Sequence, residues 1–219
     1  MTIDLGVLYG GARERIAGLV TAPGIDPDLI VPATPRWSVH DVVAHVAGIA
    51  ADGTSGNMAG APGDEWTAAQ VARGAGKSIA ELLAEWEKTG AMMAGFLSSP
   101  AGAGASAAVV DIHTHEADLR HALGLPVAVP SDFLAWAGAA MRERFAGQCE
   151  EAGLPPVDVA VDDFEFFRGC LGRRTEAEVL SYGWSTDPVP YLDAFFLFGR
   201  AEASLGEGSF GEGSFGEGS

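Results

Sequence analysis

The sequence predicts a mainly α-helical protein, in which a four-helix bundle is followed by a smaller α-rich extension with one or two short strands. Before residue 130, apolar residues recur every three or four positions in several long segments, as they do in amphipathic helices. After it the apolar segments are shorter, and the last fifteen residues repeat a unit of Gly, Glu, Ser and Phe. We therefore expect a bundle over residues 1–130, an extension over residues 131–205 and a low-complexity tail over residues 206–219.

The first two helices are separated by a proline-rich connection. Residues 3–20 place apolar side chains on one helical face and form the first predicted helix. Four prolines follow in residues 21–37 and prevent a continuous helix there. Ser38 is suited to cap the second helix, and Asp41 supplies a negative charge in its first turn, where the helix dipole favours one.

The third and fourth helices complete the predicted bundle. Residues 77–97 carry the clearest amphipathic pattern, and they follow a Gly-rich stretch at residues 53–63. A linker of small residues leads to the fourth helix, which ends near Gly124 with Pro126 just beyond it. Four helices joined by loops longer than tight turns suit a bundle, whose interior can hold ligands from facing helices.

Beyond residue 130 the elements are expected to be shorter. One helix is predicted over residues 133–147 and one short strand over residues 157–161. Two short helices are predicted over residues 175–184 and 190–199.

Composition argues against several classes of partner. Thirteen Lys and Arg against 30 Asp and Glu give a net charge of −17, which repels nucleic acid backbones and anionic membrane surfaces. No segment has the roughly 18 uninterrupted apolar residues of a membrane span, and the N-terminus does not resemble a signal peptide. We expect a soluble, cytoplasmic monomer or homodimer that binds neither nucleic acid nor membranes, with Cys149 and Cys170 as reduced thiols.

The fourth helix concentrates residues that can bind a metal. Asp111 and His115 are four positions apart and therefore share one helical face, close enough to bind one ion. A third ligand must come from another element, and His45 is the candidate because valines surround it on a helix that should be buried. The alternative is that His45 is a hydrogen-bonded core histidine and that the fourth helix presents a solvated polar face. We expect His40, His113 and His121 at the surface.

This set of donors indicates which ions can bind and what they can do. Two imidazoles and one carboxylate suit zinc, iron(II), nickel or manganese. Three protein ligands leave positions open for water or substrate, so the set favours chemistry over a structural role.

Two motifs resemble those of a known family. The run TPRWSVHDVVAHVAG is similar to the opening motif of the mycothiol-dependent maleylpyruvate isomerase family, a branch of the DinB-like metal-binding bundles. The run DIHTHEADLRHALGLP resembles the second motif of that family. The segments DDFEFFRGCLGRRTEAEV and WSTDPVPYLDAFFLFG are similar to the C-terminal part of its actinobacterial members.

The resemblance implies a divalent metal ion, most often zinc, that is held by two histidines and one acid. The matching positions here are His45, Asp111 and His115. The better-known isomerases have Glu where this chain has Asp111, and the shorter side chain leaves the choice of metal open.

The resemblance also implies a thiol cosubstrate, mycothiol, that adds to a small electrophilic molecule. If the thiol leaves again the reaction is an isomerisation, and if it stays the reaction is a transfer. Asp118 is expected to support catalysis by orienting His115 or by binding an arginine, and the alternative for it is a salt bridge at the surface or at the helix end. Two further alternatives stay open: a non-catalytic, metal-stabilised bundle that binds or senses a ligand, and a metal-dependent hydrolase with hydroxide as nucleophile.

Four more residues are candidates for parts of a binding site. Trp37 and Trp66 could form pocket walls, although aromatic residues near a helix start more often anchor a core. Arg173 and Arg174 could bind an anionic substrate, although salt bridges are the simpler expectation in so acidic a chain.

Overall fold

The computed structural model describes residues 3–206 and contains two compact units. The first unit extends to Pro126 and the second begins at Val127, close to the boundary expected at residue 130. Apart from residue 206, the predicted low-complexity tail lies outside the described residues. No helix within residues 3–206 is long and apolar enough to cross a membrane.

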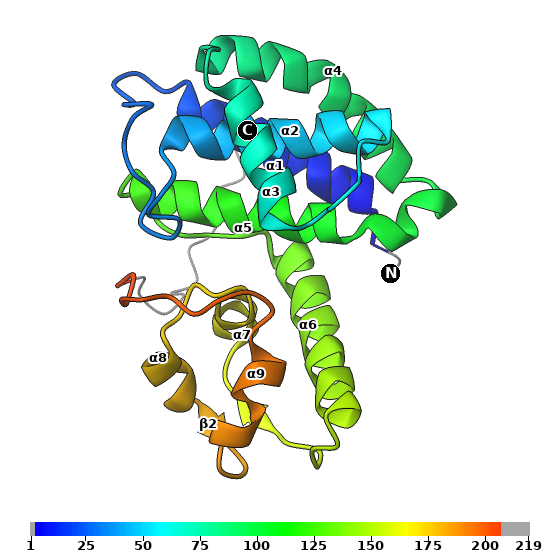
Figure 1. Cartoon of the computed structure of the whole chain (residues 1–219), viewed down its shortest axis with the longest axis vertical. Coiled ribbons are helices and arrows are strands. Elements are labelled where there is room, and N and C mark those ends of the chain that lie inside the picture. Colours follow the sequence, from blue (N-terminus) through cyan, green and yellow to red (C-terminus); the bar gives the residue numbers. More distant parts are fainter. Residues whose placement is uncertain (1–2, 207–219) are drawn as a thin grey trace, which may run out of the picture. The chain divides into compact units, whose positions relative to one another are not determined.

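The first unit is a helical bundle, as predicted (Figure 1). Its four long helices are α1 (Leu5–Val20), α2 (Val39–Ser55), α4 (Ile79–Leu97) and α5 (Ala107–Ala122). Both α4 and α5 pack against α1 and against α2, so the apolar faces of all four helices meet in one core. A short 3-10 helix, η1 (Pro100–Ala105), lies in the linker between α4 and α5.

The start of α2 is held by the cap that the sequence predicts. Oγ of Ser38 accepts a hydrogen bond from the backbone N–H of Asp41, and the Asp41 carboxylate accepts one from the backbone N–H of Ser38. Such a reciprocal pair satisfies two backbone donors that the first turn leaves without helical partners. The cap therefore determines where α2 begins, and its Ser38 lies seven positions before His45, which is buried on that helix.

An additional helix, α3 (Asp64–Gly74), lies in the connection between α2 and α4, where no helix is predicted from the sequence. Its buried residues are Trp66, Gln70 and Gly74, which share the face that packs against α2. Two of these three residues are not apolar, so the face that the helix buries does not appear as a hydrophobic period. The sequence therefore contains no periodic signal for α3.

The second unit is built around α6 (Ser131–Glu151), which packs against α7 (Asp163–Cys170) and α9 (Leu192–Phe195). The helix α7 was not predicted from the sequence. Its buried face is aromatic, and its Phe166 ring packs edge-on against Phe195.

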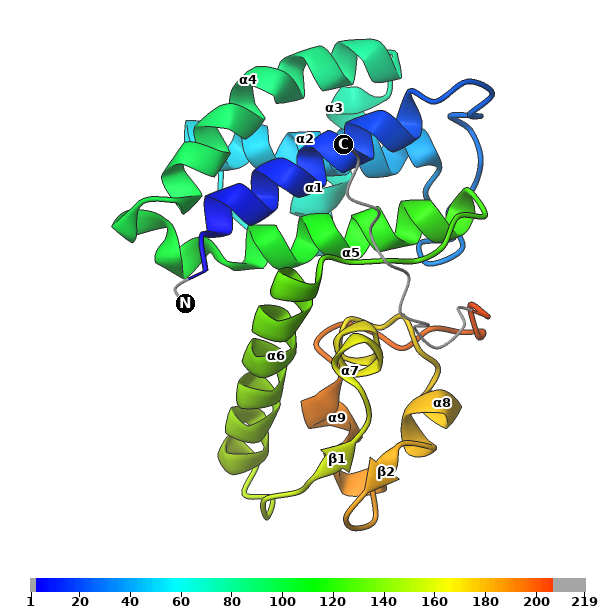
Figure 2. The same ribbon diagram turned by 180° about the vertical axis from the view of Figure 1, so that it is seen from behind.

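The remaining elements of the second unit are short. Strands β1 (Val159–Ala160) and β2 (Gly183–Trp184) form an antiparallel pair (Figure 2). They are accompanied by α8 (Glu176–Leu180) and the 3-10 helix η2 (Val189–Tyr191). The expectation of a smaller α-rich extension with one or two short strands is confirmed.

Two glycines on α1 offer a matched test of how closely α1 packs on α4. A Cβ at Gly6 would overlap the backbone oxygen of Ala94 and the hydroxyl of Ser98, whereas a Cβ at Gly10 would meet nothing within 4 Å. We expect Gly6→Ala to lower the free energy of unfolding by about 1–3 kcal/mol through overpacking. Gly10→Ala should raise it by roughly 0.5–1 kcal/mol, because Ala favours the helical backbone more than Gly does. Urea unfolding measures both, and equal effects would contradict this packing.

Candidate metal site

Three side chains that can bind a metal come together inside the first unit. His45 comes from α2, and Asp111 and His115 come from one face of α5. Nε2 of His45 lies 3.6 Å from Oδ2 of Asp111, and Nε2 of His115 lies 3.6 Å from Oδ1 of the same carboxylate. One possible ligand atom from each residue lies within 4.8 Å of the other two. Among residues 3–206, this is the one group of three or more such residues with that geometry.

The spacing of these atoms suits a single ion of zinc-like size. Metal–ligand bonds of about 2.0–2.1 Å in a tetrahedron place ligand atoms about 3.3–3.4 Å apart. The two distances of 3.6 Å are only slightly longer, so small side-chain movements would bring the atoms to bonding distance. The Asp111 side chain is 33% exposed, whereas both imidazoles are nearly buried. Asp111 is therefore the most exposed of the three candidate ligands.

Gln70 orients His45 from behind. The side-chain carbonyl of Gln70 lies 2.8 Å from Nδ1 of His45, and Gln70 is almost completely buried. Because a carbonyl oxygen can only accept, the hydrogen must be on Nδ1 of the neutral imidazole. The lone pair is then on Nε2, the atom that faces Asp111.

Asp118 occupies the equivalent place behind His115. Its Oδ2 lies 3.2 Å from Nδ1 of His115, and the residue is completely buried. Its burial is incompatible with a salt bridge at the surface, whereas its part in catalysis stays a prediction. Nδ1 of His115 makes no hydrogen bond with any residue in the described range, so the contact with Asp118 is electrostatic.

The aromatic residue Trp37 borders the cluster. The ring of Trp37 lies 4.9 Å from the His45 ring and 5.9 Å from the His115 ring, measured between centroids. Trp37 is half-buried and forms one wall of the site. Trp66 is buried on α3 instead, where its indole N–H donates to the backbone oxygen of Asn57.

Burial raises the pKa of the Tyr9 phenol to about 12, and the negative charge of Asp111 contributes in the same direction. Tyr9 consequently remains a neutral hydrogen-bonding group.

His113 and Glu116 lie on α5 between and beside the candidate ligands but are engaged elsewhere. Nδ1 of His113 lies 2.8 Å from the backbone oxygen of Val109, and Glu116 forms a bidentate ion pair with Arg15. His113 is completely buried, so its predicted surface position was wrong. The reason is that α5 packs against two helices, and Arg15 and Arg120 neutralise Glu116, which allows a polar segment to be buried.

His40 and His121 are half-buried rather than fully exposed. His40 is held through Nε2, which lies 2.7 Å from the backbone oxygen of Lys77.

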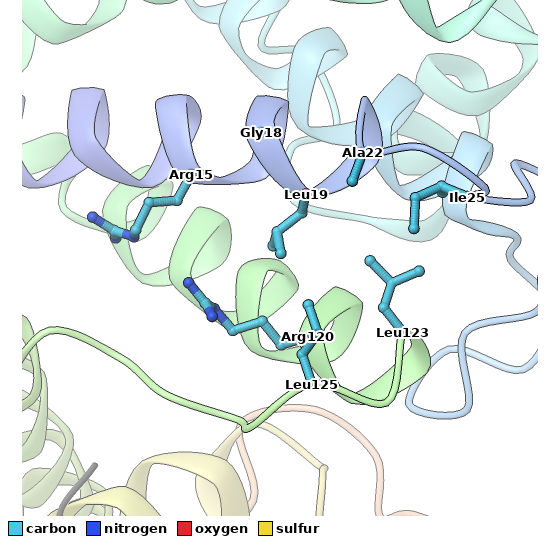
Figure 3. A pocket seen from close by; sticks show the side chains of 8 residues that line it. All are labelled: Arg15, Gly18, Leu19, Ala22, Ile25, Arg120, Leu123 and Leu125. Atoms are coloured by element: carbon cyan, nitrogen blue, oxygen red, sulfur yellow. The ribbon is translucent and has the colours of Figure 1, made fainter. Parts of the chain in front are cut away.

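A separate pocket lies between α1 and α5 and contains none of the three candidate ligands (Figure 3). Its volume is about 350 Å³. The guanidinium groups of Arg15 and Arg120 lie at one end, and Leu19, Ile25 and Leu123 line the other. Both arginines already bind Glu116, so their charges are partly satisfied within the protein.

In the second unit, the polar groups singled out from the sequence have structural roles. Arg174 is buried and forms a bidentate ion pair with Glu165, and Arg173 donates to the backbone oxygen of Leu171. Cys149 and Cys170 are buried free thiols. Burial raises the pKa of Cys170 to about 12 and also raises that of Cys149, so both thiols stay protonated near neutral pH.

Comparison with known protein families connects this geometry to a biological context. A family model described as the mycothiol maleylpyruvate isomerase N-terminal domain matches residues 9–122, more than half of the chain. The chain belongs to this family. The match runs from α1 to the last residue of α5, so the mycothiol maleylpyruvate isomerase N-terminal domain includes all three residues of the cluster. No curated protein and no solved structure gives a significant match to the chain.

Membership of the mycothiol maleylpyruvate isomerase family confirms the resemblance seen in the two sequence motifs. Two buried polar residues behind His45 were not found from the sequence. Gln70 gave no signal, because it lies on the unpredicted α3. Asp52, which contacts Gln70, lies seven positions after His45 and thus on the same face of α2, and that spacing was the available signal.

Proposed function

We propose that this chain is a divalent-metal-dependent enzyme that activates a low-molecular-weight thiol, mycothiol, for transfer to a small electrophile or for its isomerisation. Family membership supports a function connected with mycothiol. The observation that carries the proposal is the convergence of His45, Asp111 and His115 in the interior of the bundle. Zinc is the ion that we expect there, with iron, nickel or manganese as the alternatives.

The donor atoms support a catalytic rather than a purely structural site. Nε2 of His45, Nε2 of His115 and the Asp111 carboxylate would hold the ion. Once bound, the ion supplies Lewis acidity and lowers the pKa of a coordinated thiol, so that thiolate is available near neutral pH.

The surrounding residues would position the reactants. Trp37 presents a flat apolar wall beside both imidazoles, which excludes water from one side and offers a surface for the substrate. Asp118 holds His115 from behind and thus has a positioning role. The sulfur of mycothiol would donate an electron pair to the electrophilic carbon while its proton passes to solvent. The electron pair of the attacked C=C bond would move onto the conjugated carbonyl as an enolate, and its return after bond rotation expels the sulfur and gives the isomer. The conjugate results when the enolate takes up a proton instead or, with an activated aryl chloride, when chloride leaves with its bonding pair.

Two rival functions predict different behaviour. A non-catalytic bundle would close its coordination sphere with a fourth protein ligand, for which His113 and Glu116 are the nearest candidates on α5. Their contacts with Val109, Arg15 and Arg120 argue against that role. A metal-dependent hydrolase would use the same ligands but would require no thiol.

The test is turnover by purified protein that has been stripped of metal with a chelator and reloaded with zinc. Maleylpyruvate serves as the substrate for isomerisation and an activated aryl chloride as the acceptor for transfer. We expect turnover only when zinc and mycothiol are both present. Turnover that persists without any thiol would favour the hydrolase, and zinc binding without turnover of either substrate would favour the non-catalytic bundle.

A further inference from the structure

A chain of buried polar groups extends from His45 away from the candidate metal position. Gln70 contacts Nδ1 of His45 through its carbonyl oxygen, and its amide nitrogen donates to Oδ2 of Asp52 at 2.9 Å. Asp52 also accepts hydrogen bonds from Arg73 at 2.7 Å and from Asn57 at 2.8 Å. Gln70 and Asp52 are 1% and 4% exposed, so water does not compete strongly for these bonds.

The chemistry of these groups determines which of them donates and which accepts in each hydrogen bond. An ionised carboxylate only accepts hydrogen bonds, so Gln70 must turn its NH₂ group toward Asp52 and its oxygen toward His45. Burial alone would raise the pKa of Asp52, but the hydrogen bonds from Asn57, Gln70 and Arg73 outweigh it and hold that pKa below its ordinary value of 3.8. Asp52 is therefore ionised at neutral pH, and the orientation of the Gln70 amide follows.

The backbone of α2 is shaped to admit Gln70. A Cβ at Gly48 would lie 2.7 Å from Cβ of Gln70, closer than atoms normally pack. Gly48 lies between His45 and Asp52 on the face of α2 that α3 covers. The missing side chain thus allows Gln70 to reach both residues at once.

We propose that Asp52 and Gln70 are positioning residues that select the Nδ1–H tautomer of His45 and so direct its Nε2 lone pair toward the bound ion. The inference rests on the metal site of the proposed function, but it concerns the protein before the ion binds. In water a free neutral imidazole takes both tautomers, and only one of them leaves Nε2 able to bind a metal. The hydrogen bonds from Asp52 through Gln70 to His45 leave only the tautomer with hydrogen on Nδ1.

Two measurements on the full chain test the proposal without turnover. The ¹⁵N chemical shifts of His45 in metal-free protein should show hydrogen on Nδ1 at neutral pH. Gln70→Leu removes the acceptor at nearly constant size, and it should weaken zinc binding roughly 10–100-fold, as the loss of groups that support metal ligands typically does. It should also allow the second tautomer of His45 to appear in the spectrum.

A charge-conserving double variant separates this role from simple packing. Asp52→Asn removes the obligate acceptor, so the Gln70 amide can turn its NH₂ group toward His45, and zinc binding should weaken. Adding Gln70→Glu restores an obligate acceptor beside Nδ1, now a carboxylate, and the amide introduced by Asp52→Asn can donate to that carboxylate, so zinc affinity should recover to within a few-fold of the original. Packing alone predicts no such recovery, because the double variant alters two buried residues instead of one.

The possible outcomes are distinct. Hydrogen on Nε2 of His45 in the metal-free parent protein, or Gln70→Leu with unchanged zinc affinity and tautomer, would overturn the proposal. If the parent protein binds no zinc at all, the proposed metal site fails, whereas the ¹⁵N spectrum still reports whether Asp52 and Gln70 select the tautomer. The failure of one can therefore be recognised apart from the failure of the other.

Discussion

Replacing His45 or His115 with Ala is expected to weaken zinc binding on the order of a thousandfold. Zinc sites formed by a few protein ligands bind with roughly 10–16 kcal/mol, so one ligand among three accounts for about 3–5 kcal/mol. The two imidazoles come from different helices, α2 and α5, and each variant leaves a single imidazole and the Asp111 carboxylate in the cluster. Zinc per chain after dialysis, measured by mass spectrometry, should fall from about one to near zero.

His40→Gln is the matched control for these two variants. His40 also lies on α2, but it contacts the backbone oxygen of Lys77, and Gln can still donate there. Zinc content should therefore be unchanged in His40→Gln. Full retention of zinc by both His45→Ala and His115→Ala would eliminate the site and, with it, the proposed function.

The second large effect is expected from replacing Glu116 with Gln, which should lower the free energy of unfolding rather than change metal binding. The carboxylate of Glu116 is completely buried and forms ion pairs with Arg15 at 2.8 Å and with Arg120 at 3.1 Å. Removing the negative charge leaves two guanidinium groups facing each other without a counter-charge. Breaking a buried ion pair in this way typically costs about 3–5 kcal/mol. Because the two arginine side chains remain 28% and 17% exposed, we expect about 2–4 kcal/mol for Glu116→Gln.

The control for Glu116 is an ion pair at the surface of the same unit. Arg13 binds Glu87 at 2.7 Å, but the Glu87 side chain is 73% exposed. Glu87→Gln should therefore lower the free energy of unfolding by less than about 1 kcal/mol. Urea unfolding followed by circular dichroism compares the two variants directly. If Glu116→Gln lowers the free energy of unfolding no more than Glu87→Gln does, the ion pairs of Glu116 with Arg15 and Arg120 contribute no more than an exposed pair, contrary to this prediction.

The helices that carry the candidate ligands could be predicted from the sequence because their signals are local. The cap at Ser38 depends on residues three positions apart, and the shared face of Asp111 and His115 depends on a spacing of four. The family motifs then connected His45 with these two residues, which are more than sixty positions away in the chain. The structure brings the three side chains together as that connection predicts.

What the sequence alone determined was therefore the helical bundle, its family and the three residues proposed as ligands. Only the tertiary structure decided what lies behind and beside them: Gln70 on the unpredicted α3, the burial of His113, and the pairing of Glu116 with Arg15 on α1. Helical periodicity records which residues of one segment share a face. Gln70 and Glu116, in contrast, are stabilised by partners from another helix, and such pairing exists only once the helices have packed.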